Sequence, residues 1–130
     1  MTVAGEMAPV ALGSISRDAL SGYLAISGDG NPVHFDPAVA AIAGLADTPV
    51  PGLLAMALME RAVRHWFAGR EVGEFQLSFA APILPDAALV ADARPAGTSG
   101  GNDLVRVRLL CDGKIAAIGV LSIATGTERA

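Results

Sequence analysis

An aspartate and a histidine stand five positions apart in the segment SGDGNPVHFDP, which spans residues 27–37. Carboxylate and imidazole groups transfer protons at neutral pH, so Asp29 and His34 are candidates for general acid–base chemistry. Pro32 fixes one backbone angle of the segment, and a glycine flanks Asp29 on each side. The same composition suits a plain turn between helices, because Asp, Asn, Gly and Pro favour turns. On residue types alone, both interpretations stay open.

Helices are expected on both sides of this segment. Ser16 predicts the N-cap of a helix over residues 17–26, which Gly28 would end. The expected apolar side of that helix consists of Leu20, Tyr23, Leu24 and Ile26. An Asp-Pro pair then predicts the start of a short helix over residues 36–44.

The longest helical pattern in the chain covers residues 52–69. Its first three turns are apolar all round, which predicts a helix that is buried on every side. Its last part carries Arg61, Arg64 and His65, and cations at that end suit the helix dipole and a solvated position.

The second half of the chain has the two-residue period of β-strands. Phe75, Leu77 and Phe79 alternate with polar residues, and Val105, Val107 and Leu109 alternate with arginines. Strands are expected within residues 74–84, 87–97, 103–113 and 114–125, with a tight Asp-Gly hairpin at residues 111–114. This order of helices followed by strands predicts an α+β fold in which an antiparallel sheet wraps around one long helix.

Composition limits the classes of function. The chain has 130 residues and is 52% hydrophobic, which predicts a single globular domain. Its net charge of −4 and its few aromatic residues argue against binding to nucleic acid. Cys111 is the single cysteine, and residues 1–14 lack a signal-peptide pattern, so we expect a cytoplasmic protein. No apolar run is long enough to predict a membrane span.

The stretch SGDGNPVHFD resembles the signature of the MaoC-like, or (R)-specific enoyl-CoA hydratase, family. That signature is Ser-Gly-Asp, a variable residue, Asn-Pro, an aliphatic residue, His, one further residue and Asp. The matching positions are Ser27, Gly28, Asp29, Asn31, Pro32, Val33, His34 and Asp36. Farther along, VPGLLAMAL (50–58) and FQLSFAAPILPDAAL (75–89) resemble the family's long helix and its strand with a Pro turn. The chain is especially similar to short single-domain (R)-3-hydroxyacyl thioester dehydratases.

The resemblance implies one hot-dog domain over residues 1–130, with a long central helix wrapped by a curved antiparallel sheet. It also implies a homodimer or heterodimer of hot-dog subunits joined through their sheets, with the active site near the interface. The implied reaction is the reversible dehydration of (R)-3-hydroxyacyl thioesters to trans-2-enoyl thioesters. Coenzyme A or acyl carrier protein would carry the substrate, and neither a cofactor nor a metal is expected.

The resemblance also assigns roles to single residues. His34 would take the proton next to the thioester carbonyl, and Asp29 would assist the departing hydroxyl. The N–H of Gly52 could donate to the developing oxyanion, helped by the helix dipole. Asn31 would mainly shape the loop. The sequence departs from the family at Pro51, where members usually have His, and this change removes an imidazole and an N–H near the site.

Other functions are compatible with the same sequence. The chain could be a non-catalytic or carrier-binding subunit of a heterodimeric dehydratase, although such a subunit needs neither Asp29 nor His34. It could also be a specialised dehydratase of polyketide metabolism, with Pro51 adapting the site. Hot-dog thioesterases rank lowest, because they lack this pairing of Asp and His. Cys111 has no neighbouring base in the sequence, and residues 97–101 (GTSGG) predict a hairpin loop rather than a phosphate loop.

Overall fold

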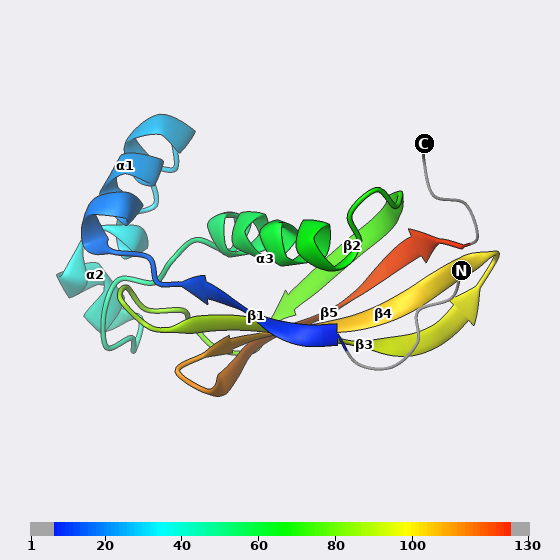
Figure 1. Cartoon of the computed structure of the whole chain (residues 1–130). Helices are drawn as coiled ribbons and strands as arrows, with labels where there is room; N and C mark the ends of the chain where they lie inside the picture. Colours follow the sequence, from blue (N-terminus) through cyan, green and yellow to red (C-terminus); the bar gives the residue numbers. More distant parts are fainter. Residues whose placement is uncertain (1–6, 126–130) are drawn as a thin grey trace.

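In the computed structural model, a five-stranded antiparallel sheet carries the long helix of residues 52–66 on one face, and the two shorter helices lie beyond one end of the sheet (Figure 1). The structure describes residues 7–125. The strands are β1 (Met7–Gly13), β2 (Val72–Phe79), β3 (Leu89–Ser99), β4 (Asn102–Cys111) and β5 (Lys114–Ala124), in the spatial order β1-β3-β4-β5-β2. The predicted domain of residues 1–130, and the segment used to exclude a signal peptide, extend into residues outside that range.

The helices are α1 (Arg17–Ser27), the 3-10 turn η1 (Pro32–His34), α2 (Pro37–Ile42) and α3 (Gly52–Trp66). The α-helices begin at the predicted positions, and α1 ends at the predicted Gly28, whereas α2 and α3 end two and three residues before the predicted Gly44 and Gly69. The Ser16 hydroxyl accepts a hydrogen bond from the Ala19 N–H at 3.1 Å, and Gly28 ends α1 in the left-handed conformation, with φ of 75°. The Asp36 carboxylate caps α2 by accepting from the Ala38 N–H at 3.0 Å. These local signals therefore predicted where the helices start.

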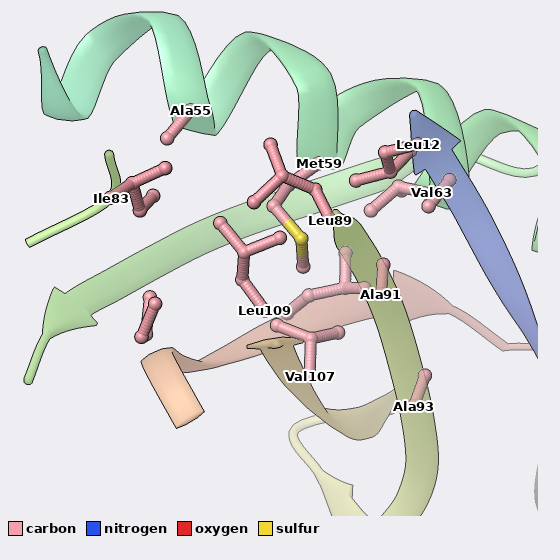
Figure 2. Packing of buried hydrophobic residues seen from close by; sticks show 14 of the residues in the cluster. Leu12, Ala55, Met59, Val63, Ile83, Leu89, Ala91, Ala93, Val107 and Leu109 are labelled. Carbon is pink, nitrogen blue, oxygen red and sulfur yellow. The ribbon is translucent and has the colours of Figure 1, made fainter. Parts of the chain in front are cut away.

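The hydrophobic core lies between α3 and the inner face of the sheet, as Figure 2 shows. Ala55, Met59 and Val63 of α3 point toward the sheet. Their partners include the buried residues Leu89, Ala91 and Ala93 of β3 and Val107 and Leu109 of β4. The predicted alternation of buried Val105, Val107 and Leu109 with Arg106 and Arg108 is confirmed.

Helix α3 is buried on one side only, so the prediction that it is buried on every side was wrong. Leu53 is 72% exposed and Ala57 is exposed, whereas Ala55 and Met59 are fully buried. The physical reason is that one open sheet can cover only one side of a helix. The opposite side of α3, although apolar in its first turns, faces outward in this chain.

Two further expectations need correction in the first part of the chain. Helices were expected first, but the strand β1 precedes them in the described residues. It forms one edge of the sheet by pairing with β3. Pro9 and the short length of β1 weaken its strand pattern, and proline is tolerated because β1 is an edge strand. Ile26, expected on the apolar side of α1, is 90% exposed, because the last turn of α1 projects beyond the sheet (Figure 1).

The hairpins follow the predicted turn residues. Asp112 and Gly113 have positive φ angles of 50° and 79° between the paired residues Cys111 and Lys114. The GTSGG stretch ends β3, and its last two glycines form the turn to β4. Within the described part of the chain, no helix is both long and apolar enough to cross a membrane.

Candidate active site

The loop between α1 and α2 is held by a series of hydrogen bonds that backbone N–H groups donate to nearby side chains. The Asp29 N–H donates to the Ser27 hydroxyl at 3.3 Å, and the Asn31 N–H donates to Oδ1 of Asp29 at 3.0 Å. The Asn31 side chain in turn accepts from the Val33 N–H at 3.1 Å and so caps η1. The side-chain oxygen of Asn31 therefore helps to hold the loop in shape.

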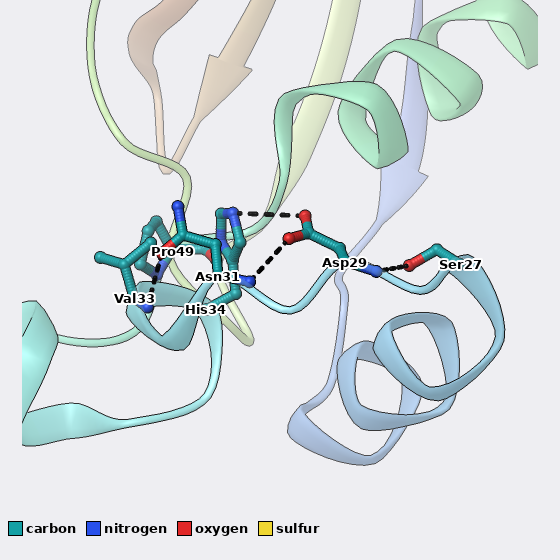
Figure 3. A network of polar contacts seen from close by, with 6 residues as sticks. All are labelled: Ser27, Asp29, Asn31, Val33, His34 and Pro49. Atoms are coloured by element: carbon teal, nitrogen blue, oxygen red, sulfur yellow. Dashed lines mark hydrogen bonds and ion pairs between the residues drawn. The ribbon is translucent and has the colours of Figure 1, made fainter.

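These bonds direct the second carboxylate oxygen of Asp29 toward the imidazole of His34 (Figure 3). Oδ2 of Asp29 lies 3.7 Å from Nε2 of His34. The two side chains are 33% and 15% exposed, so the pair is accessible without being fully solvated. The loop thus brings together the two residues that the sequence singled out, and it does so in a partly enclosed setting.

The other nitrogen of His34 is fixed from a different part of the chain. Nδ1 lies 2.8 Å from the carbonyl oxygen of Pro49 (Figure 3). A carbonyl oxygen can only accept, so Nδ1 of the neutral imidazole carries the proton and Nε2 keeps a free lone pair. His34 therefore presents a proton acceptor beside a carboxylate, which is the arrangement that a general base needs.

The segment that carries Pro49 is itself anchored at several points. The Val50 N–H donates to the carbonyl of Ile83 at 2.7 Å, and Thr48 is buried. Asp47 forms an ion pair with Arg17 at the start of α1, and its carboxylate accepts from the Thr48 N–H. The backbone hydrogen bond from Thr48, with a further contribution from Arg17, lowers the pKa of Asp47 from its ordinary value. These contacts hold the His34-binding carbonyl in place.

Helix α3 starts three residues after Pro49, at Gly52. Pro51 is the N-cap residue of α3, it is buried, and it supplies no side-chain cap. The first N–H groups of a helix have no acceptor within the helix, so the Gly52 N–H is available to a ligand. A Cβ atom on residue 52 would lie 3.0 Å from Cε2 of Phe79, so this position admits only glycine without a shift of that ring.

Sequence reasoning missed two features of this site. The carbonyl of Pro49 orients His34, but a main-chain acceptor leaves no mark on the sequence. Phe79 was identified only as part of a strand pattern, and its ring lies where a side chain on Gly52, at the start of α3, would have to fit. The one sequence signal for this position was the two-residue period of β2, which puts Phe79 on the same face of the strand as Phe75 and Leu77.

The remaining candidates stay apart from this loop. His65 and Arg61 are exposed on the last turns of α3, and Arg64 pairs with Glu60 one turn earlier at 2.9 Å. Cys111 is half-buried beside the β4–β5 turn. Among residues 7–125, no group of three or more His, Cys, Asp or Glu side chains lies close enough to hold a metal ion.

Comparison with known proteins places this chain in a family. Residues 6–114 match the family described as MaoC like domain. A mitochondrial 3-hydroxyacyl-(acyl-carrier-protein) dehydratase of Solanum lycopersicum is 32% identical over 81 residues, which cover 62% of this chain and 49% of that protein. The chain therefore spans about half the length of this curated relative.

Solved structures share the fold over nearly the whole chain. An (R)-hydratase of Pseudomonas aeruginosa aligns with a TM-score of 0.79 and 25% identity, covering 98% of this chain and 84% of that one. A chain from the ChsH1–ChsH2 complex of Mycobacterium tuberculosis aligns with a TM-score of 0.81 and 18% identity, covering 99% of this chain and all (100%) of that one. The expected hot-dog fold is confirmed, and the chain belongs to the MaoC-like domain family.

Proposed function

We propose that this protein is a hydro-lyase that interconverts (R)-3-hydroxyacyl thioesters and trans-2-enoyl thioesters. The observation that carries the proposal is the pair formed by Asp29 and His34, in which Nε2 of His34 faces Oδ2 of Asp29 at 3.7 Å. In the neutral imidazole, the contact of Nδ1 with Pro49 leaves that Nε2 as the nitrogen that can accept a proton. Family membership supports the same reaction class.

In the dehydration direction, Nε2 of His34 takes the proton from C2 of the substrate. The C3–O bond breaks as the C2–C3 double bond forms, and the imidazolium returns its proton to the departing oxygen, so that water leaves. The Asp29 carboxylate accepts a hydrogen bond from the hydroxyl that departs and stabilises the transient imidazolium. General acid–base catalysis of this kind typically contributes about 10²–10⁴-fold in rate.

Removal of the C2 proton builds negative charge on the thioester oxygen. The Gly52 N–H at the start of α3 would donate to that oxygen, and the positive end of the helix dipole adds to the stabilisation. Pro51 precedes the first residue of α3 but has neither an N–H nor an imidazole to offer. Gly52 would therefore donate to the thioester oxygen without help from residue 51. These steps use only protein groups, which is why we propose no cofactor beyond the coenzyme A or acyl carrier protein that bears the substrate.

The functional unit would be a dimer of hot-dog subunits. Strand β2 is an edge strand, and the outward side of α3 next to it is apolar, with Leu53 largely exposed. A groove of about 410 Å³ runs along that side and is lined by Tyr23, Leu53, Met56, Ala57, Glu60 and Phe75. A second subunit, either a copy of this chain or a related one, would cover β2 and this groove.

A second candidate function is a non-catalytic or carrier-binding role in a heterodimer, or a specialised polyketide dehydratase. The observation in its favour is Pro51, which departs from the family at the oxyanion end of the site. The similar chain from Mycobacterium tuberculosis also comes from a complex of two different proteins. The intact pair of Asp29 and His34 argues against the non-catalytic role, because a purely structural subunit would not need that geometry.

The test is hydration of enoyl thioesters by the purified protein. Crotonyl-CoA, longer enoyl-CoA substrates and crotonyl-acyl carrier protein are supplied separately, and the loss of enoyl absorbance is followed. The proposal predicts turnover of at least one substrate and an (R)-configured product. No turnover on any carrier, followed by turnover only after a second hot-dog protein is added, would favour the partner-subunit function.

A further inference from the structure

A groove without polar side chains lies beside the first turn of α3. Its volume is about 420 Å³, and it is lined by Val50, Gly52 and residues 79–83. The segment 79–83 reads Phe-Ala-Ala-Pro-Ile, so every side chain in the lining is apolar or absent. A groove of this character suits a hydrocarbon chain better than a charged ligand.

Several main-chain donors in the wall of this groove are already used within the protein. The N–H groups of Ala80 and Ala81 both donate to the carbonyl of Ala116, at 2.8 and 3.3 Å, and the Val50 N–H donates to Ile83. The Gly52 N–H differs from these, because the first residues of a helix have no acceptor within it. The groove therefore combines apolar walls with a donor at one end, which matches an acyl chain that ends in a thioester carbonyl.

The ring of Phe79 fills the space next to that donor. A Cβ on residue 52 would lie 3.0 Å from Cε2 and 3.3 Å from Cζ of Phe79, which is closer than carbon atoms pack comfortably. Phe79 is nevertheless 45% exposed, so much of its ring also borders the open groove. The three heavy atoms nearest to that Cβ position all belong to this ring.

We propose that Phe79 determines substrate specificity by excluding acyl groups that are branched at C2. The inference rests on the proposed function, because it places the thioester carbonyl within hydrogen-bond reach of the Gly52 N–H, about 3 Å away. C2 is bonded directly to that carbonyl carbon, and the proposal places it on the side of Gly52 that the Phe79 ring borders. A hydrogen on C2 fits there, whereas a methyl group competes with the ring for the same space.

The direct test is equilibrium binding of two unreactive thioesters, butyryl-CoA and 2-methylbutyryl-CoA, which differ only by a methyl group on C2. We expect the unmodified chain to prefer butyryl-CoA and Phe79→Ala to reduce that preference about tenfold, since one methyl group in an apolar pocket is worth roughly 10–200-fold in discrimination. The matched control is Ile118→Ala, because Ile118 is also 48% exposed but lies on the opposite face of the sheet in β5. An unchanged ratio in Phe79→Ala would overturn the proposal.

Turnover separates this inference from the proposed function. The ratio of kcat/KM for crotonyl-CoA to that for its 2-methyl derivative should fall in Phe79→Ala and stay constant in Ile118→Ala. If neither substrate turns over but the binding preference shifts as expected, the reaction is wrong and the acyl groove stands. If both substrates turn over with the same ratio in all three proteins, the reaction stands and the role of Phe79 is wrong.

Discussion

Nδ1 of His34 lies 2.8 Å from the carbonyl oxygen of Pro49, so a main-chain atom fifteen residues away decides which nitrogen of the ring can act as a base. Without that contact, a neutral imidazole could place its proton on either nitrogen. With it, Nε2 is left as the acceptor, and Nε2 is the atom that faces Asp29. The catalytic proposal therefore depends on the segment before α3 as much as on the loop that carries both side chains.

The tautomer of His34 can be observed directly. Proton–nitrogen correlation spectra of the neutral imidazole should show the proton of His34 on Nδ1. His65, the other histidine of the chain, is exposed on α3, and His65→Gln assigns the signals. A proton on Nε2 of His34 would show that the Pro49 carbonyl does not orient the ring.

The contact between Gly52 and Phe79 predicts an unusual pair of mutational effects. Gly52→Ala keeps the N–H donor but drives the new Cβ against the Phe79 ring, and a displacement of about 1 Å at such a site can cost about 10²-fold in rate. Adding Phe79→Ala removes the obstacle, so the double variant should recover part of the lost kcat/KM. Losses that simply add in the double variant would mean that the two residues act independently.

Much of the fold was predictable from local patterns in the sequence. Caps at Ser16 and Asp36, the Asp-Gly hairpin and the alternation in β4 all depend on neighbouring residues, and they lie where expected. Two features that depend on distant contacts were not predicted. The strand β1 acquires its structure by pairing with β3, and the outward side of α3 stays uncovered because the sheet is open.

In the candidate site too, the sequence predicted what depends on neighbouring residues and not what depends on distant contacts. The sequence identified Asp29, His34 and Asn31, because they lie within one short loop whose spacing resembles a known signature. It could not identify the Pro49 carbonyl or the Phe79 ring, because each is brought to the site by a tertiary contact. A main-chain acceptor has no side chain by which the sequence could reveal it.

A buried ion pair anchors the end of α3 to the sheet. Nη2 of Arg70 lies 3.1 Å from Oδ2 of Asp103, and the two side chains are only 7% and 3% exposed. Asp103→Ala would leave the Arg70 charge buried without this partner, which should lower the free energy of unfolding by about 3–5 kcal/mol. Urea denaturation measures the change.

Glu60→Ala is the matched control for that substitution, because it breaks the exposed pair with Arg64 on the surface of α3. An exposed pair one helical turn apart contributes only about 0.3–0.5 kcal/mol. Equal losses in the two variants would mean that the pair of Arg70 and Asp103 contributes no more than a surface contact.

The ion pair of Asp47 and Arg17 predicts a change of stability in acid. The pKa of Asp47 is lowered in the folded protein by the Thr48 N–H and by Arg17, so the carboxylate stabilises the fold above its ordinary pKa. That contribution is lost as the pH falls through the lowered, folded-state value. Asp47→Asn should therefore unfold at a lower urea concentration near neutral pH, and the difference from the unmodified chain should shrink as the pH falls below 3.8. A difference that stays constant with pH would contradict this assignment.

The most direct test of the account is the rate of crotonyl-CoA hydration in single variants of the proposed pair. Asp29→Asn and His34→Ala should each lower kcat by at least about 10²-fold while their circular dichroism spectra stay unchanged. His65→Ala, which alters the exposed histidine of α3, should keep the original rate. Full activity in both Asp29→Asn and His34→Ala would contradict the central claim that this pair performs the proton transfers.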